Sequence, residues 1–188
     1  MEIVRPVTIT AMLKKSPVAG RLAGLAICFL LLSGCSPTLD WREVRGDGAP
    51  YTALFPAKPA VHSRNIMLDG SAVDMTMQGA EVEGVTYAIG TVSVADAVRA
   101  NRAAAIMQEA MVRNIAGNVL LQKSVMVSGL PMAAIVAEGK NPRGEAVLLH
   151  ARFAARGTYA YQAIVLGPVS QVTNDAADTF LESFKPDQ

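Results

Sequence analysis

Cysteine is scarce in this chain, whose 188 residues include only two, Cys28 and Cys35. Both lie near the N-terminus, so the long remainder of the chain has no thiol. This excludes disulfide bonds and cysteine-based metal sites from everything after Cys35. A fold in that part must depend on its apolar core.

The motifs that usually mark catalysis or a cofactor are also missing. Gly46-Asp47-Gly48 lacks the preceding apolar strand and following helix of a dinucleotide-binding loop, and no Gly-x-Ser-x-Gly elbow occurs. Metal sites need three or four clustered donors, and neither that pattern nor the 12-residue calcium loop is present. We therefore predict a non-enzymatic protein with no catalytic residue, no metal and no cofactor.

The two histidines and several methionines have simple structural interpretations. His62 is interpreted as a solvated residue at a strand end. His150 alternates with Leu148 and Arg152, and we expect a hydrogen-bonded sheet residue covered by a helix rather than a ligand or base. Three methionines could form a soft-metal cluster, but packing is the commoner use of this side chain; they are Met75, Met77 and Met132.

Charge of one sign is not concentrated anywhere. The chain has 17 basic and 16 acidic residues in a scattered arrangement, which gives no footprint for nucleic acid and no polybasic patch for lipid headgroups. The mildest accumulation is Arg143, Arg152 and Arg156 with Lys140, which we expect at one end of a long hairpin. It is the best candidate for a partner-facing edge, and the alternative is an ordinary solvated face.

What the sequence does contain is an apolar run near the N-terminus, Leu22 to Leu32, preceded by Lys14, Lys15 and Arg21. The run is too short to span a bilayer, and a basic segment followed by a short apolar segment is the layout of a secretory signal. A start at Met12 would give a signal of more ordinary length.

The residues that follow carry a resemblance. Leu32-Ser33-Gly34-Cys35 resembles the bacterial lipoprotein signal, in which the thiol receives diacylglycerol, the chain is cut before the cysteine and the new amino group is acylated, as with palmitate. The resemblance implies a signal peptide over 1–34, a lipidated Cys35 and attachment to an envelope membrane. Ser36, rather than Asp, favours the periplasmic face of the outer membrane. The alternative for Cys35 is a small buried residue or a disulfide with Cys28.

Cutting before Cys35 would leave one domain's worth of chain. The cut removes four basic residues and one acidic residue from a chain of net charge +1, which leaves a net charge of −2. Residues 35–50 then form the lipidated cysteine, a tether of about 18 Å or less and a short edge strand over 39–45. Residues 51–188 form a single domain.

Within that domain, hydrophobic periodicity and turn residues predict four strands, a helix, four strands and a second helix. Ser93 and Asp96 have the spacing of a capping box for the first helix, Gly117-Asn118 would end it, and Thr173 or Asn174 would cap the second. The strands at 145–155 and 158–166 are apolar on both faces, which is typical of central strands. The fold class is α+β, an antiparallel sheet of about seven or eight strands covered by helices.

Three short landmarks in this arrangement resemble the PsbP-like fold. They are Tyr51-Thr52-Ala53-Leu54-Phe55-Pro56, Gly129-Leu130-Pro131-Met132-Ala133 and Phe180-Leu181-Glu182-Ser183-Phe184-Lys185-Pro186. The resemblance covers about residues 51 to 186 and implies a fold that serves mostly as a docking module. We expect a membrane-anchored envelope lipoprotein that docks an unidentified envelope protein. The alternative is a carrier of a small apolar ligand, held in a cavity between sheet and helix and lined by Met and aromatic side chains.

Overall fold

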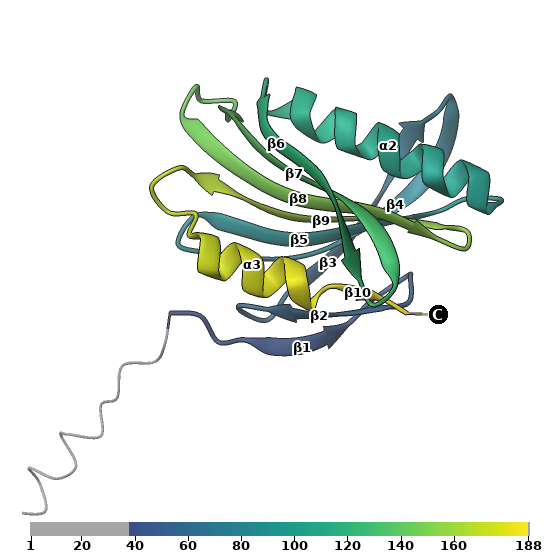
Figure 1. The fold of residues 1–188 in the computed structure, drawn as a ribbon, viewed down its shortest axis with the longest axis horizontal. Helices are drawn as coiled ribbons and strands as arrows, with labels where there is room; N and C mark the ends of the chain where they lie inside the picture. The colour runs from purple at the N-terminus through teal and green to yellow at the C-terminus, as the bar shows by residue number, and fades with distance from the viewer. Residues whose placement is uncertain (1–37, 188) are drawn as a thin grey trace, which may run out of the picture. The chain divides into compact units, whose positions relative to one another are not determined.

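The computed structural model describes residues 38–187, and the predictions for the signal, Cys35 and Ser36 lie outside this part of the chain. Within it, the chain forms ten strands and two helices (Figure 1). In chain order they are β1 Arg42–Arg45, β2 Tyr51–Phe55, β3 Ala60–Leu68, β4 Ser71–Val82, β5 Val85–Ser93, α2 Ala97–Asn114, β6 Asn118–Val127, β7 Leu130–Lys140, β8 Ala146–Arg156, β9 Tyr159–Pro168, α3 Asn174–Ser183 and β10 Lys185–Pro186.

Seven strands form one antiparallel sheet in the order β3-β4-β5-β9-β8-β7-β6. The predicted α+β class and the large antiparallel sheet are therefore confirmed. β9 is the middle strand and β8 lies beside it, as their apolar faces predicted. The hairpin between β3 and β4 turns at Asp69 and Gly70, whose φ angles of 51° and 74° are those of a tight hairpin turn.

Three short strands lie outside the main sheet. β1 and β2 do not join the main sheet but pair with each other and with the short β10 in a separate three-stranded sheet. The predicted chain order of four strands, a helix, four strands and a helix is found in β2 to β5, α2, β6 to β9 and α3, but β2 does not join the main sheet. Alternation shows that a segment is a strand, but it does not show which strand is its neighbour.

The residues that begin and end helix α2 differ from those predicted. Its N-cap is Asp96, whose carboxylate accepts a hydrogen bond from the Arg99 N–H at 2.8 Å, so Ser93 is not the cap. At the other end, the left-handed residue is Ala116, with φ 46°, rather than Gly117. The Gly117 N–H donates to the carbonyl of Val112, which makes this end a Schellman motif. The predicted Thr173 cap of α3 is confirmed.

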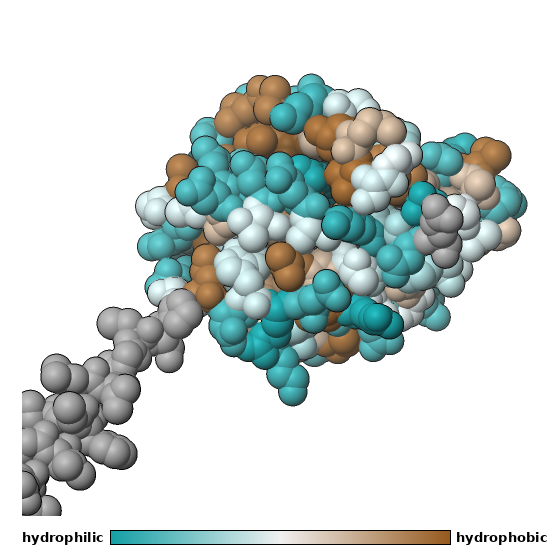
Figure 2. All heavy atoms as spheres, turned by 60° about the horizontal axis from the view of Figure 1, so that its bottom comes forward, coloured by the Kyte–Doolittle hydropathy of each residue, from teal (hydrophilic) through white to brown (hydrophobic). Residues whose placement is uncertain are grey.

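The main sheet separates two apolar cores. Helix α2 packs on one face, chiefly against β8 and β9, while α3 and the small sheet cover the other face (Figure 1). Most of the aromatic side chains lie in the second core, including Tyr51, Phe55, Tyr161, Phe180 and Phe184. Figure 2 turns the β1–β2 side forward and shows hydrophobic side chains in small groups among hydrophilic ones. The buried residues of both cores lie between 49 and 184, so this part holds a complete core of its own.

Candidate functional site

A cavity of about 310 Å³ opens between α2 and the β3–β4–β5–β9 part of the main sheet. Its lining is mainly apolar and contains methionines from three elements. We call this cavity the methionine groove and define it by Met67, Met75, Met77, Met107 and Met111.

Two methionines of β4 form the sheet side of the groove. Met75 and Met77 are two positions apart and therefore point to the same face of the sheet. Met77 lies opposite Gly90 of β5. A Cβ atom at Gly90 would lie 2.6 Å from Met77 Sδ and 2.8 Å from Met75 Cε. The missing side chain of Gly90 thus makes room for both thioethers.

The other side of the groove comes from α2 and β3. Met107 and Met111 are one turn apart on α2, so they lie on the same side of the helix. Met107 is 4% exposed, whereas Arg64 of β3 and Arg113 of α2, which belong to the same lining, are exposed. The buried Gln162 of β9 donates from Nε2 to Met77 Sδ at 3.6 Å. The groove therefore extends from a buried floor to an open mouth, and its walls are unbranched side chains that adapt to shape.

The charged residues at the groove are all basic. Arg64 of β3 and Arg113 of α2 belong to its lining, and no acidic side chain of the described residues does. Arg113 has a neighbour outside the lining, because its Nη1 lies 3.5 Å from Glu109 Oε2. Both side chains of that pair are more than 60% exposed, so the pair is weak. The site is an apolar groove with a cationic rim.

The sequence prediction located this site in part. Met75 and Met77 lie together as expected of neighbours on one strand face, but Met132 is buried in the other core, on the α3 side of the sheet. No sequence pattern singled out Met107 and Met111 of α2 as part of a site. Met107 and Met111 lie near β4 because α2 packs on β9 and β9 pairs with β5, the neighbour of β4. No local sequence pattern specifies that pairing. No aromatic residue within 38–187 lines the groove, contrary to the expectation for the carrier alternative.

A second cavity of about 310 Å³ lies on the opposite face, between α3 and strands β6 to β8. His150 contributes to it, and its Nε2 atom is buried with no hydrogen-bond partner among the described residues. Burial lowers the pKa of His150, while the carboxylate of Asp178 on α3 opposes that shift. The predicted cover by a helix is confirmed, but the predicted hydrogen bond is absent at Nε2.

Two of the three arginines proposed as partner-facing are engaged within the fold. Arg152 is only 11% exposed in its side chain, and its Nη1 donates to the carbonyl of Leu181 at 2.8 Å. Burial lowers the pKa of Arg152, and nearby acidic side chains on α3 oppose this. Arg156 donates from Nη1 to the carbonyl of Pro186 at 2.7 Å. Both side chains therefore hold the C-terminal segment against the sheet.

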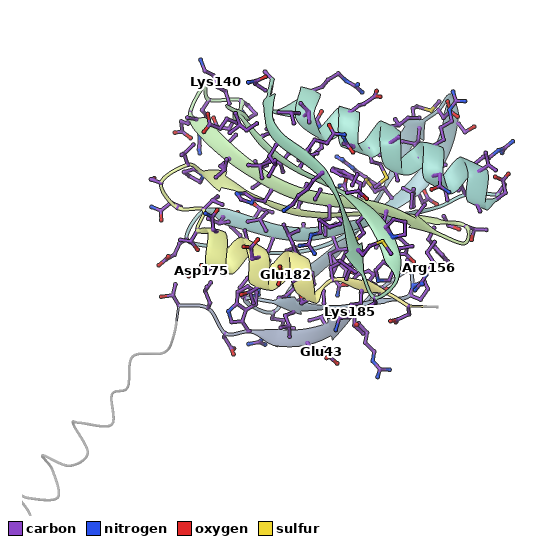
Figure 3. The ribbon with its side chains drawn as sticks, in the orientation of Figure 1. Glu43, Lys140, Arg156, Asp175, Glu182 and Lys185 are labelled. Atoms are coloured by element: carbon purple, nitrogen blue, oxygen red, sulfur yellow. The ribbon has the colours of Figure 1, made fainter. Side chains whose placement is uncertain are left out.

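The third arginine lies elsewhere. Arg143 is exposed in the β7–β8 turn, where its Nη2 lies 3.2 Å from Glu145 Oε2. Figure 3 shows Lys140, beside that turn, and Arg156 at opposite ends of the sheet. The predicted basic end of the hairpin is therefore not formed, because β8 separates its members. His62 is exposed on β3, opposite Met77.

Residues 38–187 contain no group of three His, Cys, Asp or Glu side chains placed to hold a metal ion. In the same range, none of the helices combines the length and apolar character needed to cross a membrane.

Comparison with known proteins adds one loose likeness. No family model matches the sequence, and no curated protein does. Three chains among the solved structures match. One of them is PA94, a protein of unknown function from Pseudomonas aeruginosa, with 11% sequence identity, coverage of 69% of this chain and 84% of that chain, and a TM-score of 0.36.

Proposed function

We propose that this chain is a lipid-anchored, non-enzymatic binding module of the bacterial envelope, and that it carries a small apolar ligand in the methionine groove. The single observation that supports the carrier role is the open cavity between α2 and the sheet, lined by five methionines. A sealed core would leave no place for a ligand, whereas cavities with apolar walls are the usual form of small-molecule sites.

The anchor is proposed from Leu32-Ser33-Gly34-Cys35. One acyl chain binds membranes marginally, at about 0.8 kcal/mol per buried CH₂, while two or three chains make the attachment lasting. Ser36 favours the periplasmic face of the outer membrane. We also propose that residues 51–186 form a PsbP-like domain. Its three landmarks lie in β2, at the β6–β7 turn, and from the end of α3 into β10, which supports that assignment.

Replacement of one cysteine at a time tests the anchor. Cys35→Ala should leave the protein uncut and unlipidated, so that it loses the acyl-dependent partition into the detergent phase. Cys28→Ala is the matched control, because Cys28 lies in the segment that processing removes and should leave lipidation unchanged. A Cys35→Ala protein that is still cut and lipidated would contradict the anchor.

An uncharged fluorescent probe tests the carrier role. The chain starting at Ser36 should increase the fluorescence of N-phenyl-1-naphthylamine, because the probe enters an apolar cavity. Gly90→Val should reduce that signal, since a Cβ atom at this position pushes Met75 and Met77 into the groove. Met132→Leu, on the other face of the sheet, is the control and should bind as the original chain does. Unchanged binding in Gly90→Val would contradict the assignment to this groove.

Docking of an envelope protein is the second candidate, and the edge strand β6 favours it. Leu120, Leu121 and Met126 on this strand are 53%, 48% and 67% exposed. Exposed apolar edge strands are common sites of pairing with another chain. A photoreactive residue at position 120 should give a discrete crosslinked product in cells, while one at Val98 of α2, which is 79% exposed, should not. Equal crosslinking from both positions would contradict docking at β6.

A further inference from the structure

We propose that the ligand of the methionine groove is a single-chain amphiphile with one anionic head, such as a fatty-acid carboxylate, whose head lies between Arg64 and Arg113. This inference rests on the proposed carrier function and specifies the chemistry of its ligand. It joins two features of one cavity, an apolar interior and a rim with basic side chains alone.

The interior of the groove sets the length and character of the ligand's acyl chain. A volume of about 310 Å³ is at the lower end of the ~300–1,000 Å³ range of small-molecule sites, so it accommodates one medium-length acyl chain rather than two. Thioether and aliphatic side chains form most of the floor, together with the amide of Gln162, and Met107 and Met75 are each 4% exposed. Methionine side chains rotate freely enough to follow a flexible hydrocarbon.

The rim sets the sign of the head. Arg64 lies directly opposite Met75 in the β3–β4 pair, so its side chain leaves the sheet on the same face as the methionine. Arg113 follows Ala110 by three residues on α2 and therefore lies on the same side of the helix, and both residues belong to the lining of the groove. Arg64 takes part in none of the ion pairs found within residues 38–187, and the exposed Glu109 competes only weakly for Arg113. A carboxylate at the mouth therefore meets two guanidinium groups, whereas a cationic head would be repelled.

The acyl group proposed at the processed N-terminus of this protein is a less suitable occupant of the methionine groove. Leu39 packs with the core on the α3 side of the sheet, and the groove lies on the α2 side. The part of the chain described here therefore begins on the face opposite the groove. A free ligand, delivered from solution or from a membrane, reaches the mouth without crossing the sheet.

Three ten-carbon ligands that differ only in the head test the inference: decanoate, decanol and decylammonium. Calorimetric titration uses the unlipidated chain from Ser36, whose cores are complete within residues 49–184. Decanoate should bind about twofold to thirtyfold more tightly than decanol, because two exposed ion pairs each add a modest amount. This advantage should shrink between about 0.01 M and about 1 M salt. Decylammonium should bind most weakly.

The double variant Arg64→Gln and Arg113→Gln should lower the affinity for decanoate to that for decanol, with decanol binding unchanged. Arg143→Gln, an exposed arginine outside the groove, is the matched control and should keep the preference for decanoate. If decanol binds as tightly as decanoate, or if decylammonium binds best, the anionic head is refuted while the carrier role stands. If none of the three binds to a chain that melts cooperatively, the carrier role falls as well.

Discussion

Arg152 offers the sharpest test of how α3 is held on the sheet. Its Nη1 donates to the carbonyl of Leu181 at 2.8 Å, near the C-terminal end of α3, and its side chain is 11% exposed. Replacing it with alanine removes a charged donor and leaves that carbonyl without this partner. The aliphatic stem of the arginine also leaves its apolar surroundings.

The magnitude follows from these contacts. Loss of a hydrogen bond to a charged group costs about 1.5–3 kcal/mol, and lost packing of the stem adds to this. Glu182 adds little, because its carboxylate is 3.9 Å away and its side chain is 71% exposed. We therefore expect Arg152→Ala to lower the free energy of unfolding by about 2–4 kcal/mol, a large share of the ~5–15 kcal/mol typical of a domain.

Urea unfolding followed by tryptophan fluorescence measures this change. The single tryptophan, Trp41, packs edge-on against Tyr87 at 6.2 Å on the same side of the sheet as α3. Arg143→Ala is the control, because Arg143 is exposed in a turn and should change stability by less than about 0.5 kcal/mol. An Arg152→Ala protein within that same range would refute the role assigned to Arg152.

Three further predictions concern stability. Ala116→Gly should raise the free energy of unfolding by about 1 kcal/mol, or about 2–4 °C in Tm, because Ala116 is exposed and its φ of 46° is strained for a residue with a Cβ atom. An unchanged Tm would contradict this backbone strain. Tyr51→Phe should cost about 1–3 kcal/mol in urea unfolding, since the hydroxyl donates at 2.5 Å to the buried Gln78, and no loss would refute that bond's importance. Burial lowers the pKa of His150, so the folded state binds fewer protons than the unfolded state and loses stability as the pH falls through 6.5. His150→Gln should flatten this dependence of the unfolding free energy on pH, and an equal slope in the variant would contradict it.

Elements that a short stretch of sequence specifies by itself were predictable. The two-sided apolar strands at 145–155 and 158–166 are β8 and β9 in the middle of the sheet, and the Asp69-Gly70 turn forms the β3–β4 hairpin. Caps were harder, because more than one residue near the start or end of a helix has the chemistry of a cap. Asp96 rather than Ser93 accepts the Arg99 N–H, and the chain places Ala116 where glycine is usual.

The candidate site was less predictable than the fold. Alternation placed Met75 and Met77 on one strand face, but it did not show that Met107 and Met111 of α2 lie above them. That arrangement depends on long-range strand order, with β5 beside β9. The three arginines show the converse. Their closeness along the chain suggested one basic surface, whereas β8 holds Arg156 at one end and leaves Arg143 beyond the other.

The central claim is that an acylated domain carries a small apolar ligand. The acylation can be measured directly. Mass spectrometry of the N-terminal peptide, released from protein isolated from its own envelope, measures what is attached to the processed end. The account predicts a chain that begins at Cys35 and carries the mass of a diacylglycerol and a further acyl group. An unmodified Cys35 thiol, or a chain that still contains residues 12–34, would contradict it.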